Sequence, residues 1–129
     1  TYMIDGGSFS IMAPADISSL FGNALDNAIE SVMKEGEKDR RVIKLNASSK
    51  RGYIAVHVEN YCTEVIKFKD GVPVTSKADK NEHGFGVKSM NFIVKKYGGT
   101  CIMRQEGCLV YLEIILPVPE SGRQSAVQA

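Results

Sequence analysis

The stretch His83-Gly84-Phe85-Gly86-Val87-Lys88-Ser89, followed by an apolar run from Met90 to Tyr97, decides the fold of this chain. Two glycines one residue apart let the backbone approach a bulky ligand closely and allow a positive φ without a Cβ clash. A helix that opens directly afterwards points unpaired N–H groups and the positive end of its dipole at the same place. The stretch therefore predicts a glycine loop that turns into a helix and binds an anion, most often a phosphate, although a plain turn also fits the bare pattern.

Length and composition favour one cytoplasmic globular domain. The chain has 129 residues, of which 24% are charged and 43% are hydrophobic, and its formal net charge is +1. This charge gives no field that favours nucleic acid or an anionic membrane, so we expect no nucleic-acid partner and no direct membrane contact. The N-terminus does not resemble a signal peptide. The three cysteines, Cys62, Cys101 and Cys108, fit neither a zinc pattern nor a disulfide framework, which favours reduced thiols.

Hydrophobic periodicity predicts two helices. The first follows Pro14, has apolar residues at three- and four-residue steps over 17–33, and is expected to be capped by Asp16. A charged, solvated loop is expected at 35–41. The second helix follows the glycine loop and ends at Gly98-Gly99.

Alternating apolar residues and turn signals predict the sheet. Strands are expected over residues 2–12, 42–48, 53–60, 100–105 and 109–116. Residues 61–82 have no sustained periodicity, and connections of this length are often functional lids. The order of these elements predicts an α+β fold, in which a mostly antiparallel sheet is covered by helices on one face.

Three polar residues of the first helix, Asn23, Asn27 and Glu30, are not explained by its apolar stripe. Their spacing places them on one helix face, and asparagine is a poor helix former, so two of them in mid-helix suggest a task. A magnesium ion shared with phosphates needs only one or two protein oxygens. Asn27 could supply one to Mg²⁺, and Asn23 could bind a phosphate or the same metal shell. A solvated polar face fits the same spacing.

Two of these motifs resemble those of a known family. Asn23-Ala24-Leu25-Asp26-Asn27-Ala28-Ile29-Glu30 resembles the N box of histidine-kinase ATP-binding domains. The stretch 83–89, with 93–99 behind it, resembles their second glycine box and its helix, and 111–117 looks like their closing strand. The chain thus resembles the GHKL ATPase superfamily over residues 15–117. The sequences of residues 26–30 and of Thr75-Ser76-Lys77 look most like those of its quorum-sensing peptide-receptor kinases.

The resemblance implies a two-layer α/β sandwich, the Bergerat ATP-binding fold, with ATP and Mg²⁺ as ligands. It implies that residues 1–120 form the catalytic domain. Pro117 and Pro119 close the fold, and residues 121–129 look like a disordered tail. The residues that it implies for ATP binding are Asn23, Asn27, Asn60, Lys77, Gly84, Phe85, Gly86, Val87 and Lys88.

Individual roles follow from the same resemblance. Asn27 and Asn23 would bind the metal. Gly84 and Gly86 would act as the hinge of a lid that folds over the triphosphate. Lys88 would reach a phosphate as a point charge, and Lys77 would do so in a closed state.

One position departs from the superfamily pattern. The usual Asp-x-Gly box follows the hairpin, and its aspartate accepts a hydrogen bond from the adenine amino group. The matching position here is Asn60, and no glycine follows it. Asparagine can accept that hydrogen bond through its carbonyl oxygen, more weakly than a carboxylate.

The resemblance implies the catalytic domain of a sensor histidine kinase in a two-component system. It would transfer the γ-phosphate of Mg-ATP to a histidine on the dimerisation domain of the same kinase, with a response regulator downstream. We expect no certain catalytic residue in this chain, because His57 and His83 lack a phosphoacceptor context. Two alternatives stay open: an anti-sigma-factor-type serine kinase, and a degenerate GHKL domain that acts as a non-enzymatic interaction module. The chain starts abruptly, so we expect a piece of a longer protein, which could be membrane-anchored.

Overall fold

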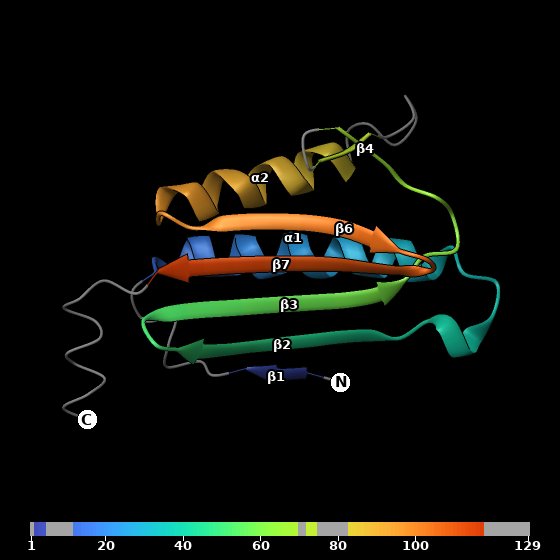
Figure 1. Ribbon diagram of the computed structural model, residues 1–129, viewed down its shortest axis with the longest axis horizontal. Coiled ribbons are helices and arrows are strands. Elements are labelled where there is room, and N and C mark those ends of the chain that lie inside the picture. The colour runs from blue at the N-terminus through green and yellow to red at the C-terminus, as the bar shows by residue number, and fades with distance from the viewer. Residues whose placement is uncertain (1, 5–11, 70–71, 75–82, 118–129) are drawn as a thin grey trace.

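The computed structural model describes residues 2–4, 12–69, 72–74 and 83–117, which form a sheet with two helices (Figure 1). The strand order is β1-β2-β3-β7-β6, with β1 parallel to β2 and the other pairs antiparallel. The sheet strands are β1 (Tyr2–Ile4), β2 (Ile43–Lys50), β3 (Tyr53–Tyr61), β6 (Thr100–Glu106) and β7 (Leu109–Pro117). The helices are α1 (Pro14–Met33), α2 (His83–Lys96) and the 3₁₀ turn η2 (Lys38–Arg40). The predicted α+β fold is confirmed.

The core lies between the two helices and one face of the sheet. Burial alternates along β3 and β7, so that every second side chain faces α1 and α2. The fully buried side chains with the largest volumes are Leu20, Ile54, Met90, Ile114 and Leu116. Each contributes about 1.5–3 kcal/mol of hydrophobic stabilisation relative to an exposed position. Among the described residues, no helix is long and apolar enough to cross a membrane.

The N-terminus of α1 is fastened to the C-terminus of α2. Ala13 occupies the N-cap position of α1, and no side chain caps it. Asp16 instead accepts hydrogen bonds from the Tyr97 hydroxyl (2.5 Å) and the Lys96 ammonium group (2.9 Å). The prediction that Asp16 caps α1 is therefore wrong, because Lys96 at the end of α2 and Tyr97 just after it donate to its carboxylate. The Tyr97 hydroxyl bond, with the Lys96 charge beside it, lowers the pKa of Asp16.

We expect this contact to make folding stability depend on acidity. A carboxylate whose pKa is lower in the folded state stabilises the fold fully above its unfolded pKa, about 4, and loses that effect as the pH falls through the folded pKa. Urea unfolding from about pH 6 down to about pH 3 should therefore show the free energy of unfolding falling less steeply in Asp16→Asn than in the unsubstituted chain. Tyr97→Phe should also reduce the dependence of the free energy of unfolding on pH. The effects of the two substitutions should not add in the double variant. Parallel slopes for all four proteins would contradict the prediction.

Helix α2 begins earlier than predicted. His83 is its first residue, so Gly84 and Gly86 lie in its first turn and not in a loop before it. The physical reason is Val87, which is only 1% exposed and belongs to the core. Burying its side chain yields about 1.5–3 kcal/mol, which offsets the combined cost of about 2 kcal/mol for two glycines in a helix. At the other end, Gly98 has a φ of 77° and the Gly99 N–H bonds to Val94 O at 2.9 Å, which confirms the predicted glycine cap.

The long connection contains structure that its sequence pattern did not predict. Within it, β4 (Lys67–Lys69) pairs with β5 (Val72–Val74) as a small antiparallel sheet, and β5 contacts α2. The expectation of a connection without strands is wrong, because these strands are too short to show a period. The signal was Asp70-Gly71 between apolar residues, a typical hairpin sequence. Residues 75–82 of the expected lid, and the expected tail at 121–129, lie outside the described residues.

Candidate functional site

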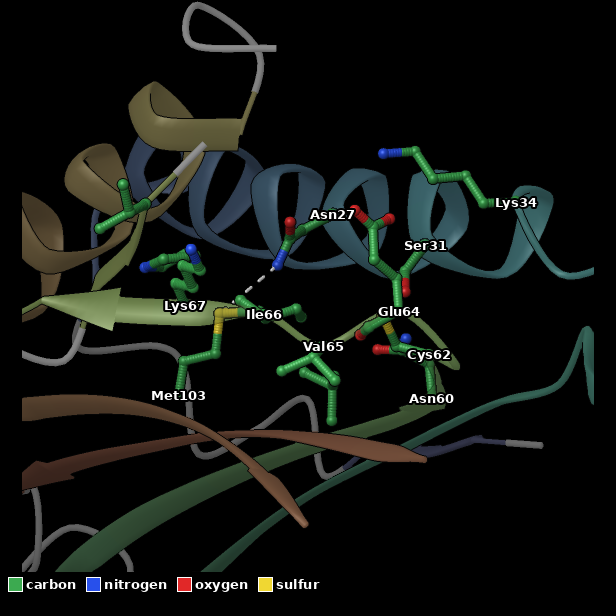
Figure 2. A pocket seen from close by; sticks show the side chains of 13 residues that line it. Asn27, Ser31, Lys34, Asn60, Cys62, Glu64, Val65, Ile66, Lys67 and Met103 are labelled. Carbon is green, nitrogen blue, oxygen red and sulfur yellow. Dashed lines mark hydrogen bonds between the residues drawn. The ribbon is translucent and has the colours of Figure 1, made fainter. Parts of the chain in front are cut away.

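A cavity of about 260 Å³ lies between α1, the neighbouring strands β3, β7 and β6, and the strands β4 and β5 (Figure 2). The elements that enclose it come from distant parts of the chain. Its polar lining includes Asn27, Ser31 and Asn60, and its apolar lining includes Ile66, Met103 and Val110. An apolar slot with a few convergent polar groups is the usual form of a small-molecule site.

Asn27 points from α1 into this cavity. It is half-buried, and its Nδ2 donates a weak hydrogen bond to Met103 Sδ at 3.9 Å, drawn as the dashed line in Figure 2. With the amide group in this orientation, its Oδ1 faces away from Met103 and can act as a ligand. Mg²⁺ prefers oxygen ligands and accepts a single protein oxygen when phosphates supply others. Asn27 therefore fits a magnesium ion that is shared with a phosphorylated ligand.

Asn60, at the end of β3, supplies the second polar group. It is only 5% exposed, and its Nδ2 donates to the Tyr61 carbonyl at 3.0 Å. Among the described residues, no donor reaches its Oδ1, so this oxygen can accept a hydrogen bond from a ligand. Ser31 Oγ donates to the same Tyr61 carbonyl at 3.3 Å and ties α1 to the end of β3. The cavity thus offers acceptor oxygens from both α1 and β3.

Two other predicted residues, Asn23 and Gly86, meet where α1 lies beside the start of α2. Asn23 lies one turn before Asn27, and its Nδ2 donates to Ser19 Oγ at 3.3 Å. A Cβ placed on Gly86 would lie 3.8 Å from Asn23 Oδ1, so the two motifs meet in space. Lys88 is exposed on α2.

Four of the predicted binding residues have no described side chain that is free to contact a nucleotide. The Val87 side chain is in the core, so a nucleotide contact there would have to come from its main chain. Lys77 lies outside the described residues. Gly84 and Phe85 are known only as part of the helical backbone of α2.

Glu35 and Gln105 hold the cavity wall, and neither was predicted. Glu35 was expected in a solvated loop but is only 6% exposed, because its carboxylate accepts bonds from Thr63 Oγ1 (2.6 Å) and Thr63 N (2.9 Å). The Thr63 hydroxyl bond lowers the pKa of Glu35. Arg40 also donates to Thr63 Oγ1, at 3.2 Å. A side chain that forms hydrogen bonds with an irregular segment has no periodic sequence pattern. The only sequence signal for Glu35 was its position next to Gly36 at the end of a helix.

A family model described as a GHKL domain matches residues 12–117, which include both motifs and the cavity. The chain belongs to the GHKL domain family. No curated protein matches it significantly in sequence.

Solved structures of histidine kinases share the GHKL fold of this chain. The catalytic domain of histidine kinase ThkA superposes with a TM-score of 0.62 at 18% identity, over 84% of this chain and 70% of that one. The blue-light activated histidine kinase EL346 of Erythrobacter litoralis gives 0.61 at 19% identity, over 98% of this chain and 36% of that one. Histidine kinase AdeS of Acinetobacter baumannii gives 0.57 at 15% identity, over 82% of this chain. This chain spans 47% of the AdeS chain.

Proposed function

We propose that this GHKL chain is the ATP-binding catalytic domain of a sensor histidine kinase. The cavity binds Mg-ATP, and the γ-phosphate passes to a histidine on a separate dimerisation domain of the same kinase. The observation that carries the proposal is that Asn27 and Asn60 line one cavity in a chain of this family. Phosphoryl transfer depends on positioning and charge stabilisation, so a domain without its own nucleophile suits the reaction.

The two ends of the cavity have different roles. Asn60 Oδ1 accepts a hydrogen bond from the adenine amino group, and the apolar side chains of Ile66, Met103 and Val110 contact the base. Asn27 Oδ1 holds Mg²⁺, which when bound offsets charge on the triphosphate.

The α1–α2 junction is assigned to the phosphates. Asn23 and Lys88 bind them, and Gly84 and Gly86 let the main chain of α2 come close. The main chain of Phe85 and Val87 and the side chain of Lys77 complete the phosphate side when the lid closes.

The wider setting is part of the same proposal. Residues 1–120 constitute the catalytic domain of a longer, cytoplasmically exposed kinase, and 121–129 are a tail. The partners are the dimerisation domain and a downstream response regulator. The wording of residues 26–30 supports the quorum-sensing peptide-receptor branch.

Thermal unfolding with and without nucleotide tests the proposal. A ligand that binds only the folded state at about 100 times its Kd stabilises it by about 2.7 kcal/mol. We expect ATP with Mg²⁺ to raise the Tm of the 129-residue chain, and ATP with EDTA to raise it less, because Asn27 acts through the metal. GTP with Mg²⁺ is the control for base recognition. No stabilisation by ATP under either condition would contradict the proposal.

The replacement of the usual aspartate by Asn60 favours one other reading, a degenerate domain that binds partners without nucleotide. The thermal experiment separates the two. Stabilisation by ATP that is weaker in Asn60→Leu supports a nucleotide site, whereas equal unfolding temperatures with and without ATP support the interaction module.

A further inference from the structure

The carboxamide of Gln105, on edge strand β6, bonds to three backbone groups of the irregular segment 62–66. Its Oε1 accepts from Ile66 N at 2.8 Å, and its Nε2 donates to Glu64 O at 2.9 Å and Cys62 O at 3.1 Å. All three distances are those of ordinary hydrogen bonds. Both donor hydrogens and one acceptor site of the carboxamide are therefore used on a single stretch of chain.

The segment 62–66 forms part of the cavity wall beside Asn60. Cys62, Glu64, Val65 and Ile66 all line the cavity, whereas Gln105 is not among its described lining residues. Hydrophobic burial holds only the two ends of this wall, because Cys62 belongs to the core and Ile66 packs against it. The middle is exposed, with Val65 82% exposed, and the segment has no regular secondary structure.

Hydrogen bonds from three other parts of the chain also hold this segment in place. The Cys62 N–H donates to Cys108 O at 2.8 Å, and Glu35 binds Thr63 from the opposite side. Gln105 contributes the bonds that reach furthest along the segment, from residue 62 to residue 66.

We propose that Gln105 is a positioning residue of the nucleotide site, a role that rests on the proposed function. It shapes the wall beside Asn60 before the nucleotide arrives, so that the base end of the cavity is preformed. A preformed site binds more tightly because less chain has to be ordered on binding. Glutamine suits the position because glutamate cannot donate to the carbonyls of Cys62 and Glu64, and leucine can make none of the three bonds.

The test compares Gln105→Leu and Gln105→Glu with the unsubstituted chain in titrations of a fluorescent ATP analogue, once with Mg²⁺ and once with EDTA. We expect both variants to raise Kd about tenfold, the effect of losing roughly one hydrogen bond to a charged or well-ordered group. Because the wall lies at the base end, Kd should rise by the same factor with and without Mg²⁺. Circular dichroism measures the folded fraction of each variant, so that a general loss of stability is not counted as a loss of affinity. Gln105→Glu keeps the side-chain length and the bond to Ile66 N, so it serves if Gln105→Leu does not fold.

Hydrogen exchange in the absence of nucleotide gives a second measurement. The Ile66 amide donates to Gln105 Oε1, so it should exchange faster in Gln105→Leu, while the amides of β3 and β7 keep their rates. Arg104→Met is the matched control. It lies on the same strand, and its side chain contacts Glu113 and the Tyr111 ring on the sheet face away from the helices. It should change neither the Ile66 exchange rate nor, beyond about twofold, the Kd.

Three results would contradict either the positioning role of Gln105 or the proposed function. If the unsubstituted chain binds the analogue and the Gln105 variants bind within about twofold of it, the positioning role is wrong and the proposed function stands. An increase in Kd that occurs only with Mg²⁺ would also overturn the positioning role. If the unsubstituted chain does not bind the analogue at all, the proposed function fails, and the positioning role fails with it.

Discussion

Asn27→Ala is expected to lower the affinity for Mg-ATP by about 10- to 150-fold, the range that corresponds to losing about 1.5–3 kcal/mol from a polar contact with a charged group. The reason is that Asn27 lines the cavity from α1 and its Nδ2 reaches only Met103 Sδ, which leaves Oδ1 to bind the metal in the proposed site. Isothermal titration with ATP, in Mg²⁺ and then in EDTA, measures the effect. The loss should appear with Mg²⁺ and nearly vanish with EDTA, because the side chain acts through the metal.

Asn46→Ala is the matched control for this substitution. Asn46 is exposed on β2, where it pairs with His57 in the sheet register, and it does not line the cavity. Its replacement should leave the affinity with Mg²⁺ within about twofold of the original. An Asn27→Ala protein that folds normally and binds as tightly as Asn46→Ala in Mg²⁺ would refute the metal role of Asn27.

In the proposed site Asn27 serves the phosphate end and Gln105 the base end, and magnesium distinguishes the two roles. Loss of the Asn27 amide should change the ratio of the two Kd values measured with and without Mg²⁺. Loss of the Gln105 carboxamide should change both Kd values and keep their ratio. The two variants together therefore determine which end of the cavity faces the phosphates.

Much of the fold follows from periodic patterns in the sequence. The apolar steps of α1 and the alternation of β3 and β7 are local signals, and each reports which face a residue buries. The two-residue turn at Arg51 and Gly52 has φ values of 49° and 85°, and the glycine in the sequence is a local signal for such a turn. These signals specify the elements and the inner face of the sheet, and the two-layer arrangement follows from them.

Other features depend on contacts that no local pattern encodes. Whether α2 starts at His83 or after Gly86 depends on the burial of Val87, a tertiary contact that outweighs the helix propensity of glycine. Asp16 is a residue type that often caps a helix, but Lys96 and Tyr97 donate hydrogen bonds to its carboxylate and so determine its role.

The residues of the site likewise include some that a local sequence pattern reveals and some that only a tertiary contact reveals. Asn27 is conspicuous because asparagine is costly in mid-helix. Gln105 is an ordinary strand residue whose importance appears only when segment 62–66 lies beside it.

Gly99→Ala is expected to lower the free energy of unfolding by at least about 3 kcal/mol, a large share of the total stability of a small domain. A Cβ on Gly99 would lie 2.2 Å from Ile115 O and 2.9 Å from Leu116 Cδ2. The leucine methyl could move aside, but the carbonyl belongs to β7, the strand paired with β6. Relief would require the start of β6 to shift away from β7, and β6 also carries Met103 and Gln105. Urea unfolding should measure the loss of stability, and the affinity for Mg-ATP should fall with it.

Gly36→Ala is the control that separates this clash from the general effect of removing a glycine. No atom lies within 4 Å of a Cβ placed on Gly36, and its φ is not positive. The substitution should therefore change the free energy of unfolding by no more than about 0.5 kcal/mol, as most surface changes do. The close packing of the α2–β6 turn against β7 predicts a clear difference between the two variants. Equal stabilities would mean that this turn can relax without disturbing the strand that carries one wall of the site.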